Sequence, residues 1–201
     1  MMSLRVVTHL WNSLAPSARE DSLVLNQHSW LPGSAGEKSE VTDNEFQRIV
    51  KSLQLAPETI RELVSGLPDK SLTWKPSGTE FSILEHICHL RDIEKEGYAV
   101  RIEKLLTEVE PLLRDIDGNR LADERVYNRQ NLRTALLEFT LARENNVRVL
   151  QCLTLDQLSR NGIFEKVGSV SLEGLMIMMS EHDQEHLKEL TDLRGRLDID
   201  Q

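Results

Sequence analysis

From about residue 42 onward, apolar residues recur at intervals of three and four positions, which is the spacing of one face of an α-helix. In the first such stretch, Thr42 followed by Glu45 is typical of a helix start, and Gly66 with Pro68 is typical of a helix end. Pro57 falls inside this stretch. The first helix is therefore expected to bend or to restart there.

The same spacing predicts three more helices. Ser82 with Glu85 repeats the capping pattern, and the helix that follows is expected to continue to about Leu106. A third helix is expected from about Asn131, and a fourth is expected after Ser171. Each of the four helices carries an apolar stripe that must be buried against a neighbour.

Four amphipathic helices predict an all-α fold, a four-helix bundle over residues 42–197, because packing their apolar stripes together removes them from water. A long polar connection, which contains Pro111 and residues 115–119, is expected between the second and third helices. Asn161-Gly162 predicts a turn, and the strand-like stretch 163–170 is too short to predict a sheet.

Residues 1–41 differ from this pattern and predict a flexible N-terminal extension. They contain scattered Pro, Gly and Ser and no sustained apolar period. The first nineteen residues carry Arg5 and Arg19 and no acid, as transit peptides do, but they lack the apolar core of a secretory signal. Residues 33–39 have the composition of a phosphate-binding loop with the wrong glycine spacing, so a linker is the better interpretation.

Composition narrows the class of protein. The 201 residues suit one domain, and 24 Lys+Arg against 33 Asp+Glu give a net charge of −9, which argues against a nucleic-acid partner. No apolar run approaches the ~18–20 residues that span a bilayer, so no membrane association is expected. Two cysteines do not make a disulfide framework, and a reducing cytoplasm is the expected compartment.

The six histidines are the chemically informative residues. His182 and His186 are four positions apart on the predicted last helix, so their side chains lie one turn apart on the same side. Two neutral imidazoles in this arrangement can bind one cation. The alternative is a polar pair at the rim of the bundle, hydrogen-bonded to Asp183 or Glu185. Zinc proteases carry Glu directly after the first histidine, where this chain has Asp183.

A facing helix would have to supply a third ligand, and the predicted second helix offers His86 and His89. Glu85, His89, Asp92 and Glu96 fall on one face of that helix, so carboxylates could hold the second nitrogen of the His89 ring. The alternative is a solvated acidic stripe with an incidental histidine.

Several segments together resemble the DinB/YfiT-like superfamily. They are Leu67-Pro68, Trp74-Lys75-Pro76, the stretch SILEHICHLRDIE at 82–94 and the stretch SEHDQEHL at 180–187. Members of that superfamily are four-helix bundles that hold a divalent metal with three histidines. The resemblance covers residues 43–195 and implies that His89, His182 and His186 are the metal ligands. Phe81 stands where the pattern usually carries Trp, which is expected to affect packing more than chemistry.

Three protein ligands leave a coordination position open, which is typical of a catalytic metal site. An all-histidine set suits Zn or Ni, with Fe, Mn or Cu as alternatives. The resemblance implies a homodimeric thiol S-transferase, in which a low-molecular-weight thiol such as bacillithiol or mycothiol attacks a small-molecule electrophile. A thiol-dependent isomerase, a non-catalytic metal-binding stress-response bundle and a metal-free scaffold remain alternatives.

Other residues are candidates for supporting roles. Asp92 and Glu85 could support the ligands, and Tyr127 and Arg125 could cover the cleft and bind substrate. Arg91 and Arg143 are the candidate contacts for an anionic thiol, although surface roles are expected for both.

The remaining histidines and the cysteines are less specific. His86 could be a fourth ligand, a support for the ligands or a rim histidine. His9 and His28, in the extension, are expected to be incidental. Cys88 and Cys152 are expected to be structural, because free cysteine is usually buried, and the Met-rich run 175–179 is expected to pack in the core.

Overall fold

The computed structural model describes residues 43–199, and four long helical segments account for most of that span. They are α2 (Asp43–Val64), the continuous unit α4–η1–α5 (Ile83–Asp92, Ile93–Tyr98 and Ala99–Thr107), α7 (Leu132–Leu150) and α9 (Leu172–Ile199). The predicted four-helix bundle is confirmed. Thr42 and the extension 1–41, with its targeting-like and loop-like stretches, His9 and His28, lie outside the described residues.

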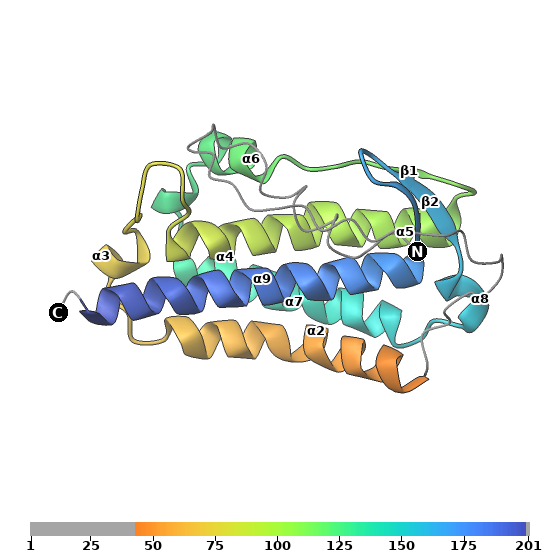
Figure 1. The fold of residues 1–201 in the computed structure, drawn as a ribbon, viewed down its shortest axis with the longest axis horizontal. Helices are drawn as coiled ribbons and strands as arrows, with labels where there is room; N and C mark the ends of the chain where they lie inside the picture. The colour runs from red at the N-terminus through yellow and green to blue at the C-terminus, as the bar shows by residue number, and fades with distance from the viewer. Residues whose placement is uncertain (1–42, 200–201) are drawn as a thin grey trace, which may run out of the picture.

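The bundle has one long crossover. In Figure 1, α2 and α9 run in one direction, and α4–α5 and α7 run in the other. The main contacts are those of α2 with α7 and α9, and of α4 with α7 and α9, so each helix has one parallel and one antiparallel neighbour. Because α4–α5 and α7 are parallel, residues 108–131 must return along the length of the bundle (Figure 1). This return segment contains α6 (Gly118–Glu124) and η2 (Tyr127–Arg129), and it confirms the predicted long connection.

The predicted helix boundaries have the expected physical causes. The Ser82 hydroxyl accepts from the Glu85 N–H, and the Glu85 carboxylate accepts from the Ser82 N–H, which is a complete capping box. The Asn131 side chain caps α7, and the Ser171 hydroxyl accepts from the Gly174 N–H at 3.0 Å at the start of α9. A short helix, α3 (Asp69–Leu72), follows the end of α2.

The first helix does not restart at Pro57. Helix α2 is one continuous helix that contains this proline. Proline has no N–H, so the Leu53 carbonyl loses its normal helical partner. The buried Arg143 guanidinium donates to that carbonyl instead, with Nη1 3.1 Å from the oxygen. A side chain of α7 thus replaces the hydrogen bond that Pro57 removes.

The second helix contains a feature that the apolar period does not predict. Its middle segment, η1, is a π-helix, in which backbone hydrogen bonds join residues five positions apart instead of four. The segment starts immediately after Asp92 and carries Glu94 into the interior, where it is 1% exposed. Such turns frequently occur at functional sites.

The prediction that no sheet forms is wrong. Strand β1 (Leu112–Leu113) pairs in parallel with β2 (Asn161–Phe164), and β2 pairs antiparallel with β3 (Gly168–Ser171). The predicted turn at Asn161-Gly162 therefore lies inside β2, after the short helix α8 (Leu155–Leu158). The actual turn, residues 165–167, carries Lys166 at φ 65°, and Gly168 at the start of β3 has φ 102°. The sheet attaches the return segment to one end of the bundle.

The core consists of two apolar clusters, and buried polar residues lie between them on the α4–η1 unit, α7 and α9. On α9, for example, Met179 belongs to one cluster and Leu190 to the other, and His182, Asp183 and His186 lie between them. The Met-rich run is core, as predicted, with Leu175, Met176, Met178 and Met179 buried. Among the described residues, no helix is both long and apolar enough to cross a membrane.

Candidate metal centre

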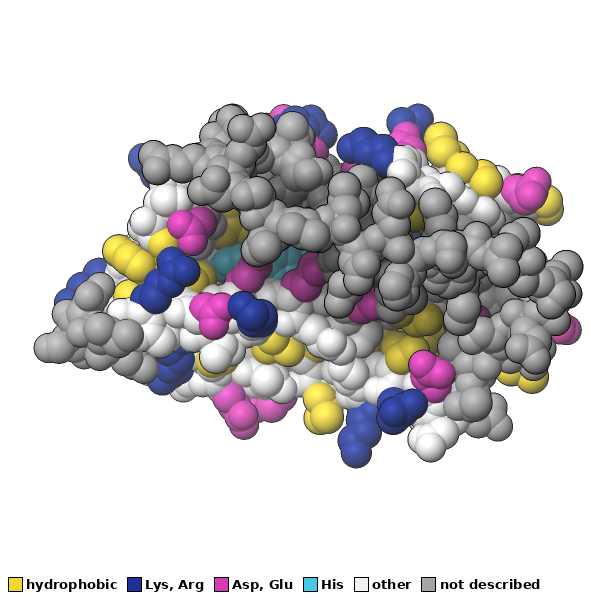
Figure 2. All heavy atoms as spheres, viewed as in Figure 1, with side chains coloured by type: hydrophobic (Ala, Val, Ile, Leu, Met, Phe, Trp, Pro, Cys, Tyr) yellow, Lys and Arg dark blue, Asp and Glu magenta, His cyan; other side chains and the backbone are white. Residues whose placement is uncertain are grey.

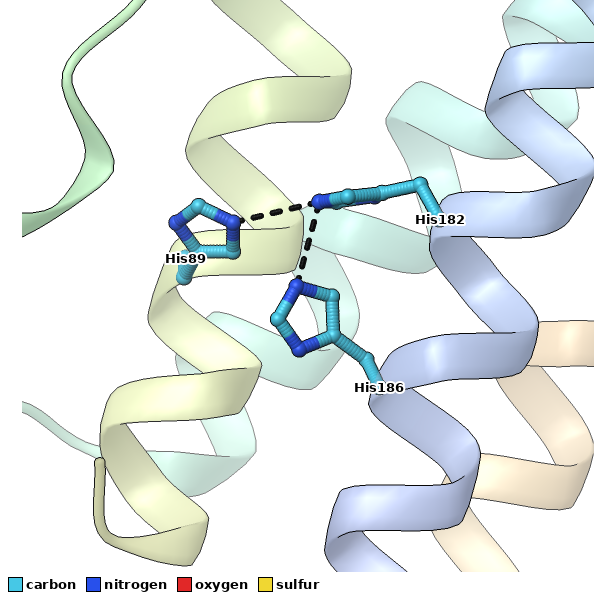
Figure 3. A group of neighbouring side chains, drawn as sticks. All are labelled: His89, His182 and His186. Atoms are coloured by element: carbon cyan, nitrogen blue, oxygen red, sulfur yellow. Dashed lines mark hydrogen bonds between the residues drawn. The ribbon is translucent and has the colours of Figure 1, made fainter. Parts of the chain in front are cut away.

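Two antiparallel neighbours, α4 and α9, bring the three predicted ligands together. His89 comes from the last turn of α4, and His182 and His186 come from consecutive turns of α9 (Figure 3). The predicted helical spacing of His182 and His186 places both rings on the side of α9 that faces α4. The face of α4 that packs on α9 supplies the third ring, as predicted.

The three imidazole rings point the same type of atom, Nε2, toward one another. His182 Nε2 lies 3.2 Å from His89 Nε2 and 3.1 Å from His186 Nε2. A neutral imidazole has only one proton or one lone pair at this atom, so His182 Nε2 has to share it between two neighbours. A cation would instead accept a lone pair from each of the three nitrogens.

The spacing fits a first-row divalent ion. A metal bound about 2.0–2.1 Å from two nitrogens holds them about 2.9 Å apart at a right angle and about 3.3 Å apart at the tetrahedral angle. The observed separations of 3.1 and 3.2 Å fall between these limits. The donor set and its geometry therefore fit a divalent metal.

The protonation states also suit metal binding. His89 and His182 are buried, at 6% and 5% exposure. Burial lowers the pKa of both imidazoles well below the usual value, and the adjacent His186 lowers it further. Both rings are therefore neutral near pH 7, which leaves a lone pair available for a metal.

The outer nitrogen of His186 has its own partners. Its Nδ1 lies 3.1 Å from Glu189 Oε2 and 2.9 Å from His86 Nδ1. A carboxylate on the second nitrogen of a metal ligand fixes the tautomer and the orientation of the ring. Glu189 was not predicted, although its position three residues after His186 on the same helix was a usable signal.

His86, left open by the sequence, lies beside His186. It is 6% exposed, so the interpretation as a rim histidine is wrong. His86, His186 and Glu189 form a second group of close ligand atoms. Because this group uses the Nδ1 of His186, and Nε2 of the same ring faces His89 and His182, we interpret it as support for the His186 ring.

Aromatic rings line the other sides of the cluster. The Phe81 ring centroid lies 5.7 Å from that of His89 and 5.5 Å from that of His86, and the Tyr98 centroid lies 6.0 Å from that of His182. Phe81 therefore has a packing role, as predicted, and its ring packs against His89, a candidate metal ligand. Figure 2 shows the histidines recessed on this face, with acidic side chains beside them.

The two carboxylates predicted to support His89 are engaged elsewhere. Glu85 completes the helix cap and binds Lys75 at 3.0 Å. Asp92 accepts hydrogen bonds from Arg91, Arg125 and Tyr127, each at 2.6 Å. Burial would raise the pKa of Asp92, but these hydrogen bonds outweigh it and lower the pKa, so Asp92 stays ionised.

The other four side chains that were candidates for substrate binding are also buried or engaged in structural interactions. The Tyr127 hydroxyl is buried against Asp92, and Arg125 binds both Asp92 and Glu96. Arg91 and Arg143 are 7% and 1% exposed, so the expectation of surface roles is wrong.

Arg143 is the centre of a buried ionic cluster next to the histidines. Its guanidinium binds Asp183 and Glu94, with Nη2 2.8 Å from Glu94 Oε2, and Asn146 donates to Glu94 at 2.7 Å. Asp183, which directly follows His182, therefore faces Arg143. Three long helices meet in this cluster.

The two cysteines differ. Cys88 is fully buried, as predicted, and burial raises the pKa of its thiol to about 12. Its sulfur lies 3.9 Å from the Tyr127 carbonyl oxygen, in the core beside α4. Cys152 is exposed, so its predicted burial is wrong. The chain thus places neither thiol among the three histidines.

The structure so far defines a helical bundle with a three-histidine cluster suited to a divalent metal. The family model of the DinB superfamily matches residues 52–190. The chain therefore belongs to the DinB superfamily. Among solved structures, it is similar to YfiT from Bacillus subtilis, which is described as a probable metal-dependent hydrolase with an unusual four-helix bundle topology. The match has a TM-score of 0.74 and 18% identity, and it covers 82% of this chain and 94% of YfiT. No curated protein matches the chain.

Proposed function

We propose that this chain is a metal-dependent enzyme that binds one divalent ion through His89, His182 and His186 and transfers a low-molecular-weight thiol to a small electrophile. The convergence of the three Nε2 atoms, two of them 3.1 and 3.2 Å from the third, carries the metal site. A divalent ion held there would supply a Lewis acid that lowers the pKa of a bound thiol or water.

The arrangement of acids and thiols favours a thiol cosubstrate. Asp92 and Glu85, the carboxylates closest in sequence to His89, are already bound to other groups, so neither is available as a general base. A thiol that a metal activates loses its proton on binding and needs no such base. Cys88 is buried against the Tyr127 carbonyl, so the reacting sulfur would come from a second substrate.

The chain's own residues would orient and shield the reaction. His182 and His186 are held by successive turns of α9, and Glu189 fixes the His186 ring. Phe81 and Tyr98 cover two of the imidazoles and limit access of water. In the transfer, the sulfur forms a bond to the electrophilic carbon, the leaving group departs with the electron pair of the broken bond, and the thiol proton passes to solvent.

Hydrolysis is the second candidate, and the description of YfiT as a probable metal-dependent hydrolase favours it. In that case water replaces the thiol as the nucleophile at the same three histidines. The two candidates differ in whether turnover requires a thiol.

A parallel assay separates the candidates. Metal-loaded protein is mixed with monochlorobimane and bacillithiol, mycothiol or cysteine, and separately with p-nitrophenyl acetate without thiol. We expect thiol-dependent fluorescence growth that His182→Ala and chelator abolish. Ester cleavage that depends on the metal and needs no thiol would support hydrolysis instead. Metal binding without turnover in either assay would contradict both and support a non-catalytic bundle.

A further inference from the structure

The return segment between α5 and α7 touches the candidate metal centre directly. Gly118, the first residue of α6, lies against the ring of His89. A Cβ built on Gly118 would lie 2.4 Å from His89 Cε1 and 2.6 Å from His89 Nδ1. Unstrained carbon contacts are about 3.5–4.0 Å. Any side chain at this position would therefore displace either the imidazole or α6.

The contact falls on the edge of the ring that does not face the other histidines. The same built Cβ lies 3.7 Å from His89 Nε2, which is the atom that faces His182. His89 Nδ1 is buried and has no hydrogen-bond partner among the described residues. A hydrogen bond thus holds the outer nitrogen of His186, whereas packing against Gly118 and Phe81 holds the outer edge of His89.

We propose that Gly118 is a positioning residue of the metal centre. The absence of a side chain lets the backbone at the start of α6 pack on the Nδ1–Cε1 edge of His89 and fix the direction of its Nε2. The assignment rests on metal binding by the three histidines, but it is independent of whether thiol transfer or hydrolysis follows. It also gives the long return segment a role at the site.

Gly118→Ala tests the assignment, with Gly195→Ala as the matched control. Gly195 lies in α9, and a Cβ there meets nothing within 4 Å. We expect Gly118→Ala to raise the dissociation constant for Zn²⁺ about 10- to 100-fold in a chelator competition. We also expect it to alter the visible spectrum of the Co²⁺-loaded protein, and Gly195→Ala to change neither. A Zn²⁺ affinity for Gly118→Ala within twofold of the parent, with an unchanged Co²⁺ spectrum, would overturn the proposal.

A second measurement needs no metal. The thermal midpoint of the metal-free protein is compared among the parent, Gly118→Ala, His89→Ala and the double variant. Because His89→Ala removes the ring that a Cβ would strike, Gly118→Ala should lower the midpoint much less in that background. Equal decreases of the thermal midpoint in the two backgrounds would contradict the contact. If Gly118→Ala does not fold, a double variant that also does not fold would contradict it as well. If the parent protein binds no metal, the proposed function fails, whereas this comparison still reports whether Gly118 positions His89.

Discussion

His186 has two ring nitrogens with different neighbours. Nε2 faces His182, and Nδ1 lies between Glu189 and His86. The sequence spacing predicts the first relationship, because residues four apart share a helix face. It does not predict that His86 is buried rather than at the rim, because burial depends on the packing of α4 against α9.

Glu189→Gln should weaken metal binding without unfolding the protein. The amide keeps the shape of the side chain but loses the negative charge that holds His186 Nδ1–H. We expect the Zn²⁺ dissociation constant to rise about 10-fold or more, measured by chelator competition. Asp192→Asn is the control, because Asp192 is exposed on the same helix and pairs with the exposed Lys188. Equal affinities in the parent and Glu189→Gln would show that this carboxylate does not support the ligand.

The two thiols should react at very different rates. Burial raises the pKa of Cys88 to about 12, so very little of this thiol is present as the reactive thiolate at pH 8. In native protein, we expect Ellman's reagent to label one thiol rapidly, and Cys152→Ser to remove that phase. A second rapid thiol that disappears in Cys88→Ser would contradict the buried position.

At the scale of elements, buried charges join helices that the apolar pattern treats separately. Arg143 of α7 binds Glu94 of η1, Asp183 of α9 and the Leu53 carbonyl of α2. Burial raises the pKa of Glu94, because it disfavours the ionised carboxylate. The positive charge of Arg143 offsets the cost of burying the Glu94 and Asp183 carboxylates. The π-helix that carries Glu94 inward belongs to the same arrangement.

Replacement of Arg143 by Met should destabilise the protein strongly. The change leaves two buried carboxylates and a helical carbonyl without their partner, and such losses cost about 3–5 kcal/mol. Urea denaturation of the metal-free protein measures the difference in free energy of unfolding. Arg148→Met on the exposed face of the same helix should change it by less than about 0.5 kcal/mol. A similar small change for Arg143→Met would mean that the cluster contributes little.

Among the elements, the helix starts could be predicted from the sequence, whereas contacts between distant segments could not. Capping residues such as Ser82 and Asn131 act within one helical turn, so their helix starts could be predicted locally. The sheet could not, because β1 has only two residues and pairs with a strand about fifty positions later. The contact of Gly118 with His89 is likewise invisible in sequence, since it depends on the path of the return segment.

At the scale of the whole molecule, the candidate centre depends on the crossover topology. The antiparallel packing of α4 on α9 joins the histidines, and the parallel packing of α4–α5 and α7 obliges the return segment to pass over α4 (Figure 1). The family motifs predicted the three ligands in sequence. The geometry adds the residues that hold them, which are Phe81, His86, Gly118 and Glu189. The homodimer and the cytoplasmic location stay predictions.

Metal content is the most direct test of the central claim. Protein purified without chelators, exposed to Zn²⁺ or Ni²⁺ and separated from free metal is analysed for bound ions per chain. We expect one ion per chain in the parent and in His28→Ala, and none retained in His89→Ala, His182→Ala or His186→Ala. Circular dichroism of each variant controls for folding. A folded parent protein that retains no divalent metal, or a folded His182→Ala that retains as much as the parent, would contradict the three-histidine metal centre.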